Sequence, residues 1–191
     1  MLHLGRYLIG IDSADTQTTE AERARLSYYA RGKSRAVEIG VYEGVGTRTI
    51  AAHMAPSGIL FAVDPFLRGR LGICWSQPIA RLEMRKARRA TIHMIQAYSQ
   101  DAVRMIEGKF DLLFIDGDHS DAGIRRDWND WAPRMQIGGI VALHDTRVPD
   151  HHPTIAELGS YKFFESDIRH DPRFRLLEQV DSLSVLERSG S

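Results

Sequence analysis

The sequence predicts an α/β protein built on a Rossmann-like, doubly wound sheet of about seven strands, mostly parallel, with an antiparallel hairpin at its C-terminal end. Two patterns predict this class. Short apolar stretches alternate with longer amphipathic ones from residue 36 to residue 145, which is typical of βα units around a parallel sheet. After one more helix, 174–180 and 183–186 have the composition of a hairpin. The length of 191 residues favours one domain.

The individual elements follow from local signals. Thr19-Glu20-Ala21-Glu22 fits a capping box, so a helix is expected from there to about Tyr29, ended by Gly32. Residues 65–76 are expected to be irregular. Ile124, Trp128 and Trp131 share one helix face because they recur at helical spacing. The expected strands are 36–39, 59–63, 91–95, 112–115 and 140–143, and the helices between them are 47–54, 77–89, 100–107 and 121–132.

Composition removes several classes of function. Lys+Arg 25 equals Asp+Glu 25, so the net charge is zero, which argues against nucleic acid or a membrane surface as the main partner. The single cysteine, Cys74, excludes an internal disulfide and a multi-cysteine zinc site. The apolar run within residues 1–15 is too short to cross a bilayer and no signal peptide is evident. We therefore expect a cytoplasmic protein.

Acidic and imidazole groups lie at the carboxyl ends of four of the expected strands. They are Glu38 in the first strand, Asp64 after the second, Asp116-Gly117-Asp118-His119 after the fourth, and His144-Asp145 after the fifth. In doubly wound folds, ligands bind outside the carboxyl ends of the strands, where the strand order reverses. The sequence therefore predicts that the chemistry takes place at this edge of the sheet.

The turn after the first strand carries Gly40, Gly44 and Gly46, spaced G-x-x-x-G-x-G and not as the dinucleotide fingerprint G-x-G-x-x-G. Glu38, two residues before Gly40, would repel a pyrophosphate and favour a cationic ligand. Asp64 ends the next strand, where an acid can bind both hydroxyls of a ribose. Together these residues indicate a nucleoside pocket with a cationic tail, although a purely structural turn has the same glycine spacing.

With these motifs in place, the sequence resembles the class I S-adenosylmethionine-dependent methyltransferases. Segments 37–44, 110–120 and 138–146 are similar to small O-methyltransferases of the catechol, caffeoyl-CoA and macrolide-sugar types. The resemblance implies one methyltransferase domain over 1–191, in which 1–31 is an N-terminal helical segment, 36–145 the cofactor-binding core, and 146–191 the acceptor-side loop, helix and closing hairpin. It also implies a small hydroxylated acceptor (a sugar, phenol or natural product), and a homodimer, since small relatives often dimerise.

The same resemblance implies the cofactor-binding residues. S-adenosylmethionine would lie with its methionine end at the glycine turn, its ribose at the second strand and its adenine near the third. The residues implied are Glu38, Gly40, Tyr42, Gly44, Gly46, Asp64, Ser99 and Asp116.

A divalent metal is implied as well. Relatives place one acid after the fourth strand and an acidic or amide pair after the fifth, and Asp116 and Asp145 occupy two of these positions. His144 stands where the relatives have an acid. Carboxylates suit Mg²⁺, whereas imidazole suits zinc, iron or nickel. The expected ligands are thus Asp116, His144 and Asp145, with the metal either Mg²⁺ or another divalent ion; caps for the following helix, from Asp118 or Ser120, are the structural alternative.

His119 is the candidate general base, because histidine titrates near neutral pH and an attacking hydroxyl must lose its proton. A histidine bonded to backbone at a helix start is the alternative. Two other functions stay open: a metal-dependent hydrolase or hydroxylase, and a non-catalytic cofactor-binding domain. A short-chain reductase would need Y-x-x-x-K after the glycine turn, but Tyr29 to Lys33 precedes it. The basic segment Arg68–Arg89 is expected to be a solvated helix face, with a docking patch for an acidic acceptor as the alternative.

Overall fold

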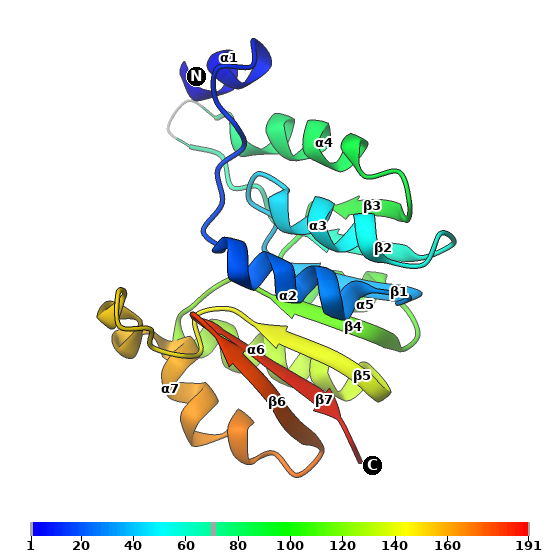
Figure 1. Cartoon of the computed structure of the whole chain (residues 1–191), viewed down its shortest axis with the longest axis vertical. Coiled ribbons are helices and arrows are strands. Elements are labelled where there is room, and N and C mark those ends of the chain that lie inside the picture. The colour runs from blue at the N-terminus through cyan, green and yellow to red at the C-terminus, as the bar shows by residue number, and fades with distance from the viewer. Residues whose placement is uncertain (1, 70–71, 191) are drawn as a thin grey trace.

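The computed structural model describes residues 2–69 and 72–190, and its centre is a seven-stranded sheet of order β3-β2-β1-β4-β5-β7-β6 (Figure 1). Strands β1 to β5 are parallel to one another, and β7 is antiparallel to both β5 and β6. The predicted fold class is therefore confirmed. The strands are β1 Arg35–Ile39, β2 Ile59–Val63, β3 Thr91–Ile95, β4 Phe110–Ile115, β5 Met135–Leu143, β6 Phe174–Val180 and β7 Leu183–Arg188.

Helices cover both faces of the sheet. Helices α2, α3 and α4 lie over one face and α5, α6 and α7 over the other (Figure 1). The helices are α1 Leu2–Leu8, α2 Glu20–Ala30, α3 Val45–His53, α4 Ser76–Lys86, α5 Ser99–Met105, α6 Asp121–Trp131 and α7 Gly159–Ser166, and short 3₁₀ turns occupy Ala132–Arg134, Pro153–Glu157 and Ile168–His170.

The core is divided by the sheet. One cluster joins β1, β4 and β5 to the apolar stripe of α6, where Ile124, Trp128 and Trp131 pack as their spacing predicts. The other joins the opposite side chains of the same strands to α2 and α3, through Leu26 and Ile50. Burying both faces explains why these central strands are almost continuously apolar, as expected for a parallel sheet.

Strand β5 begins earlier than the sequence predicts, at Met135 and not at Ile140. Gly138 has a φ of 78°, and the register against β4 shifts between Phe110 and Leu112. Gly138 and Gly139, which directly precede the predicted strand 140–143, instead form an irregularity inside a longer strand, because glycine accepts the positive φ that this bend requires.

The strand order reverses beside β1, whose neighbours are β2 and β4. Backbone hydrogen bonds continue past the strand ends: Gly40 N donates to Val63 O at 2.9 Å, Asp116 N to Ile39 O at 2.8 Å, and His144 N to Ile115 O at 3.0 Å. Each residue that follows a strand is thus held against the end of its neighbour. This brings the predicted acidic and imidazole groups to one edge of the sheet.

The N-terminal helix α1 lies at one end of the molecule, near α4 (Figure 1). None of its residues is buried, and Leu2 and Leu8 are exposed. It is attached through Tyr7, whose hydroxyl donates to Glu83 at 2.6 Å. In the described part of the chain, no helix has the length and apolar character needed to cross a membrane.

Replacing Phe110 with alanine should lower the free energy of unfolding by about 3–5 kcal/mol, the usual cost of truncating a buried aromatic side chain. Phe110 is fully buried and contacts Trp131 with ring centroids 5.9 Å apart. Ile137→Ala is the matched control, since Ile137 is 71% exposed in the next strand. Urea denaturation measures the free energy of unfolding of both variants. Equal losses in the two variants would contradict the placement of Phe110 in the core.

Candidate active site

A cavity of about 520 Å³ opens at the carboxyl ends of β1, β2 and β4, a size typical of small-molecule sites. Segment 15–18, which precedes α2, forms part of its wall. The sequence-predicted residues that line it are Glu38, Gly40, Tyr42, Gly46, Asp64, Ser99 and Asp116. Gly44 is not among the lining residues: it is the N-cap of α3, with φ 81°.

Position 40 in the glycine turn requires glycine for a steric reason. Its φ is 89°, and a Cβ atom there would lie 1.9 Å from the carbonyl oxygen of Asp116. Only glycine lets the end of β1 approach the end of β4 this closely. Gly46 has a related role, because a Cβ would lie 2.5 Å from Oε1 of Glu38.

Glu38 is buried below the first turn of α3 and accepts a hydrogen bond from the hydroxyl of Thr47. Burial raises the pKa of Glu38 well above its usual range; the Thr47 hydrogen bond opposes this shift, and the nearby charges of Asp116 and Asp64 add to it. The side chain therefore fastens the glycine turn to α3 and also reaches the cavity wall.

Asp64 binds the same turn from the side of β2. Its Oδ2 accepts from the backbone N–H groups of Val41 and Tyr42 at 2.9 and 3.0 Å, and its Oδ1 accepts from Phe66 N at 2.6 Å. An ionised carboxylate has about four acceptor positions, so it can still bind a ribose hydroxyl. Asp64 thus orders the glycine turn and remains available to a ligand in the cavity.

Asp127 is a cavity residue that the sequence analysis missed. It is buried on α6, its Oδ1 accepts a hydrogen bond from the hydroxyl of Ser99, and both residues line the cavity. Burial raises the pKa of Asp127 to about 6, against the opposing effect of the Ser99 hydrogen bond. The available signal was its spacing: an acid at position 127 lies on the same helix face as Ile124, Trp128 and Trp131.

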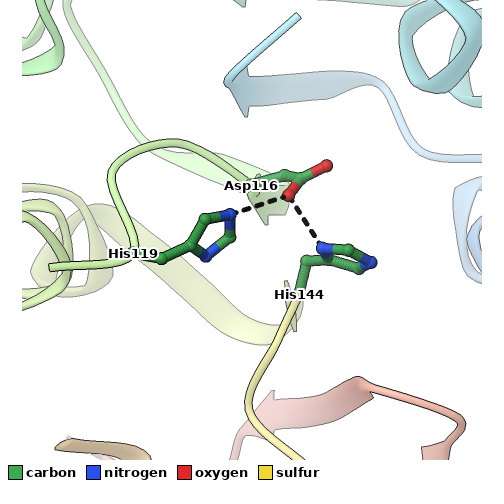
Figure 2. A group of neighbouring side chains, drawn as sticks. All are labelled: Asp116, His119 and His144. Carbon is green, nitrogen blue, oxygen red and sulfur yellow. Dashed lines mark ion pairs between the residues drawn. The ribbon is translucent and has the colours of Figure 1, made fainter. Parts of the chain in front are cut away.

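A second cluster lies just beyond Asp116. Figure 2 shows Asp116 between two imidazoles, and the ligand atoms of Asp116, His119 and His144 all lie within 4.8 Å of one another. Nε2 of His119 is 3.6 Å from Asp116 Oδ1 and 3.8 Å from Asp145 Oδ2. Nδ1 of His144 is 2.9 Å from Asp116 Oδ1 and 3.6 Å from Asp145 Oδ1. The four residues that the sequence assigned to metal binding and proton transfer therefore come together.

Glu22 is the other residue that the sequence analysis did not assign to the site. It was recognised only as part of the capping box, which the structure confirms. Its carboxylate is fully buried, and Oε2 lies 3.4 Å from Nε2 of His144. Burial lowers the pKa of His144, but the facing carboxylates of Asp116 and Glu22 outweigh burial and raise it to about 10. Burial conversely raises the pKa of Glu22, but His144 and backbone donors bring it to about 2.

The donor set fits a bound cation. Asp116 Oδ1 and His144 Nδ1 are buried, and neither has a hydrogen-bond partner in the described part of the chain although they lie 2.9 Å apart. A buried carboxylate oxygen and a buried imidazole nitrogen this close together are both metal-ligand atoms, and one ion could bind both in place of the His144 proton. The predicted cap is present as well: Ser120 is the N-cap of α6, and Asp118 accepts from Ser120 N at 2.9 Å.

The basic segment is partly neutralised. Glu83, its one acid, is buried and lies 3.1 Å from Nε of Arg48 and beside Lys86. Arg81 and Arg85 are exposed on α4, as expected for a solvated helix face, and Arg70 lies outside the described residues. Cys74 is half-buried in the cavity wall with its Sγ 3.1 Å from the Ser76 hydroxyl.

A doubly wound sheet with an acidic cavity at its switch point defines a class of α/β proteins that bind nucleoside-containing ligands. A family model described as a methyltransferase domain matches residues 37–146, which is more than half of the chain. The chain therefore belongs to this methyltransferase family, and the family predicted from the sequence is confirmed.

Solved structures share the fold. An O-methyltransferase from Bacillus cereus in complex with SAH is 18% identical with a TM-score of 0.60, covering 98% of this chain and 91% of that chain. A methyltransferase from Podospora anserina, also SAH-bound, is 17% identical with a TM-score of 0.63 over 98% and 86%. An rRNA methylase from Streptococcus thermophilus is 14% identical with a TM-score of 0.59 over 87% and 93%.

Replacing Asp127 with asparagine should stabilise the protein at pH 8 by about 2–3 kcal/mol, the free energy equivalent of a two-unit pKa shift. Because the pKa is raised in the folded state, ionisation of Asp127 costs stability as the pH rises through about 6. Below its unfolded pKa the carboxyl is neutral in both states, so the difference should vanish near pH 3.5. Urea denaturation at both pH values measures this; an equal difference at the two pH values would contradict it.

Proposed function

We propose that this chain is an S-adenosylmethionine-dependent methyltransferase that methylates a hydroxyl group of a small acceptor, with assistance from a divalent metal. The observation that carries the proposal is the direct contact between two sites: Asp116 lines the cofactor-sized cavity and also belongs to the His119–His144 cluster. A methyl donor in the cavity and a hydroxyl at the cluster would therefore lie on either side of Asp116. The two SAH-bound methyltransferases of the same fold support this assignment.

The cavity suits the cofactor chemically. S-adenosylmethionine supplies an electrophilic methyl group on a cationic sulfonium. Asp64 and Asp116 give the cavity an acidic wall, which favours a cation. Asp64 is proposed to bind the ribose, Ser99 to lie at the adenine, and the turn of Gly40, Tyr42 and Gly46 to hold the methionine end. The buried Asp127 would hold Ser99 in place.

His119 is proposed as the general base. Its side chain is about a quarter exposed, so an acceptor can reach it, and its Nε2 faces Asp116 and Asp145. These carboxylates would stabilise the imidazolium that forms when Nε2 takes the hydroxyl proton. In the net reaction, the acceptor oxygen forms a bond to the methyl carbon, the S–CH₃ bond breaks with its electron pair left on sulfur, and the proton passes to His119.

Asp116, His144 and Asp145 are proposed to hold the metal ion. When bound, a divalent ion lowers the pKa of a hydroxyl that it contacts and orients it. Asp116 and Asp145 supply carboxylate oxygens, and His144 supplies Nδ1. The acceptor class, a sugar, phenol or natural product, follows from the resemblance of the strand-end motifs and is part of the proposal.

Asp64→Ala should weaken S-adenosylmethionine binding by at least about tenfold, since the ribose loses a charged acceptor and the glycine turn loses two hydrogen bonds. Asp111→Ala is the matched control. Asp111 likewise accepts backbone hydrogen bonds, from Ser34 N and Arg35 N, but at the opposite edge of the sheet. Isothermal calorimetry measures both. Equal affinities of the two variants for S-adenosylmethionine would refute the proposal that Asp64 binds the ribose. If the wild type did not bind S-adenosylmethionine, the proposed cofactor itself would be refuted.

His119→Ala should lower kcat by about 10²–10⁴, the usual contribution of a general base, while the affinity for S-adenosylmethionine stays unchanged. The measurement is the formation of S-adenosylhomocysteine with catechol and a sugar glycoside as probe acceptors. His170→Ala is the control, because His170 is exposed and outside the cavity. If His119→Ala had the same kcat as His170→Ala, His119 would be excluded as the general base.

A further inference from the structure

Glu22 is more firmly held than a helix cap requires. Its Oε1 accepts from Ser182 N at 2.8 Å and from the Ser182 hydroxyl at 2.7 Å, in the turn between β6 and β7. Its Oε2 accepts from Thr19 N at 2.8 Å and lies 3.4 Å from Nε2 of His144. Three hydrogen bonds from residues other than His144 thus fix an ionised, fully buried carboxylate against one side of the imidazole.

This contact decides which nitrogen of His144 carries the proton. A carboxylate accepts hydrogen bonds and does not donate them, so Nε2 must carry the hydrogen that faces Glu22. Nδ1 faces Asp116 Oδ1, 2.9 Å away, and both atoms are buried. Without a metal, Nδ1 can hold a proton that faces the Asp116 carboxylate. A bound metal ion would replace that proton, and the lone pair of the neutral ring would then lie at Nδ1.

We propose that Glu22 is a positioning residue that presents Nδ1 of His144 as a nitrogen ligand, so that the metal site prefers a first-row transition metal such as Co²⁺ or Zn²⁺ to Mg²⁺. This inference rests on the metal site of the proposed function. A carboxylate on the second nitrogen of a histidine fixes the ring and increases its basicity as a ligand. Imidazole favours these metals, whereas Mg²⁺ prefers oxygen ligands only.

The arrangement ties the metal site to two distant segments. Glu22 lies on α2, its partner Ser182 lies between the last two strands, and His144 follows β5. The ligand His144 is therefore held from the face of the sheet opposite α6, while Asp116 and His119 come from the strand end that leads into α6. A change at Glu22 can alter the metal preference without touching the cofactor cavity, whose lining does not include Glu22.

The test is metal binding by the full-length protein after removal of metal with a chelator. Co²⁺ is titrated while the visible absorption of the bound ion and the heat of binding are recorded, and Mg²⁺ is then added as competitor. Wild type should bind Co²⁺ at least about tenfold more tightly than Mg²⁺. Glu22→Gln should weaken Co²⁺ by about 10–100-fold, the range for loss of such a partner, because the amide can donate to Nε2 and shift the ring proton to Nδ1.

Thr19→Ala is the matched control. It removes the other half of the same capping box, the hydrogen bond from Glu22 N to the Thr19 hydroxyl, without touching His144, and should leave Co²⁺ affinity within about twofold. His144→Asp is a second variant, independent of the folding of Glu22→Gln, and its all-oxygen ligands should lower the ratio of Co²⁺ to Mg²⁺ affinity by at least about tenfold.

The proposal is overturned if wild type binds Mg²⁺ as tightly as Co²⁺, if Glu22→Gln folds and keeps the wild-type Co²⁺ affinity, or if His144→Asp keeps the wild-type ratio of Co²⁺ to Mg²⁺ affinity. Binding of S-adenosylhomocysteine is measured on every sample. Wild type that binds the nucleoside but neither metal would refute the metal site and leave the cofactor assignment standing, whereas loss of nucleoside binding in the wild type would refute the proposed function itself.

Discussion

The structure depends on how closely the carboxyl ends of β1 and β4 approach each other. At Gly40, the backbone of the turn after β1 lies so near the carbonyl of Asp116 that a Cβ atom would be 1.9 Å from it. Hydrogen bonds from Asp116 N to Ile39 O and from His144 N to Ile115 O extend the same alignment to β5. Because these three strands end side by side, the cofactor cavity and the imidazole cluster are adjacent. Asp116 belongs to both the cavity and the cluster.

The distribution of charge follows from this alignment. The chain has no net charge, but acids gather where the strands end, and their surroundings differ. Asp64 is stabilised by backbone N–H groups, whereas Glu38 is buried, which raises its pKa and favours its neutral form. His144 is enclosed by carboxylates from three elements. A neutral protein is thus acidic in the region where we propose that a cationic cofactor and a divalent ion bind.

Much of this could be predicted from the sequence, because the signals are local. The apolar alternation indicated where the strands lie along the chain and that most of them are parallel, and the acids at 38, 64, 116 and 145 were recognised because they lie at strand ends. Asp127 and Glu22 were harder. Each satisfies a local pattern, a helix face for Asp127 and a capping box for Glu22, and the partners that give them a further role, Ser99 and His144, are 28 and 122 positions away in the sequence. Spacing within one element carries no information on such contacts.

The most direct test is a crystal structure of the protein with S-adenosylhomocysteine and Co²⁺, with the metal located by anomalous scattering. We expect the nucleoside in the cavity between the glycine turn and Asp127, with its ribose at Asp64, and one Co²⁺ ion bound by Asp116 Oδ1 and His144 Nδ1. An empty cavity, or an ion bound elsewhere while His144 keeps its contact with Asp116 unchanged, would contradict it.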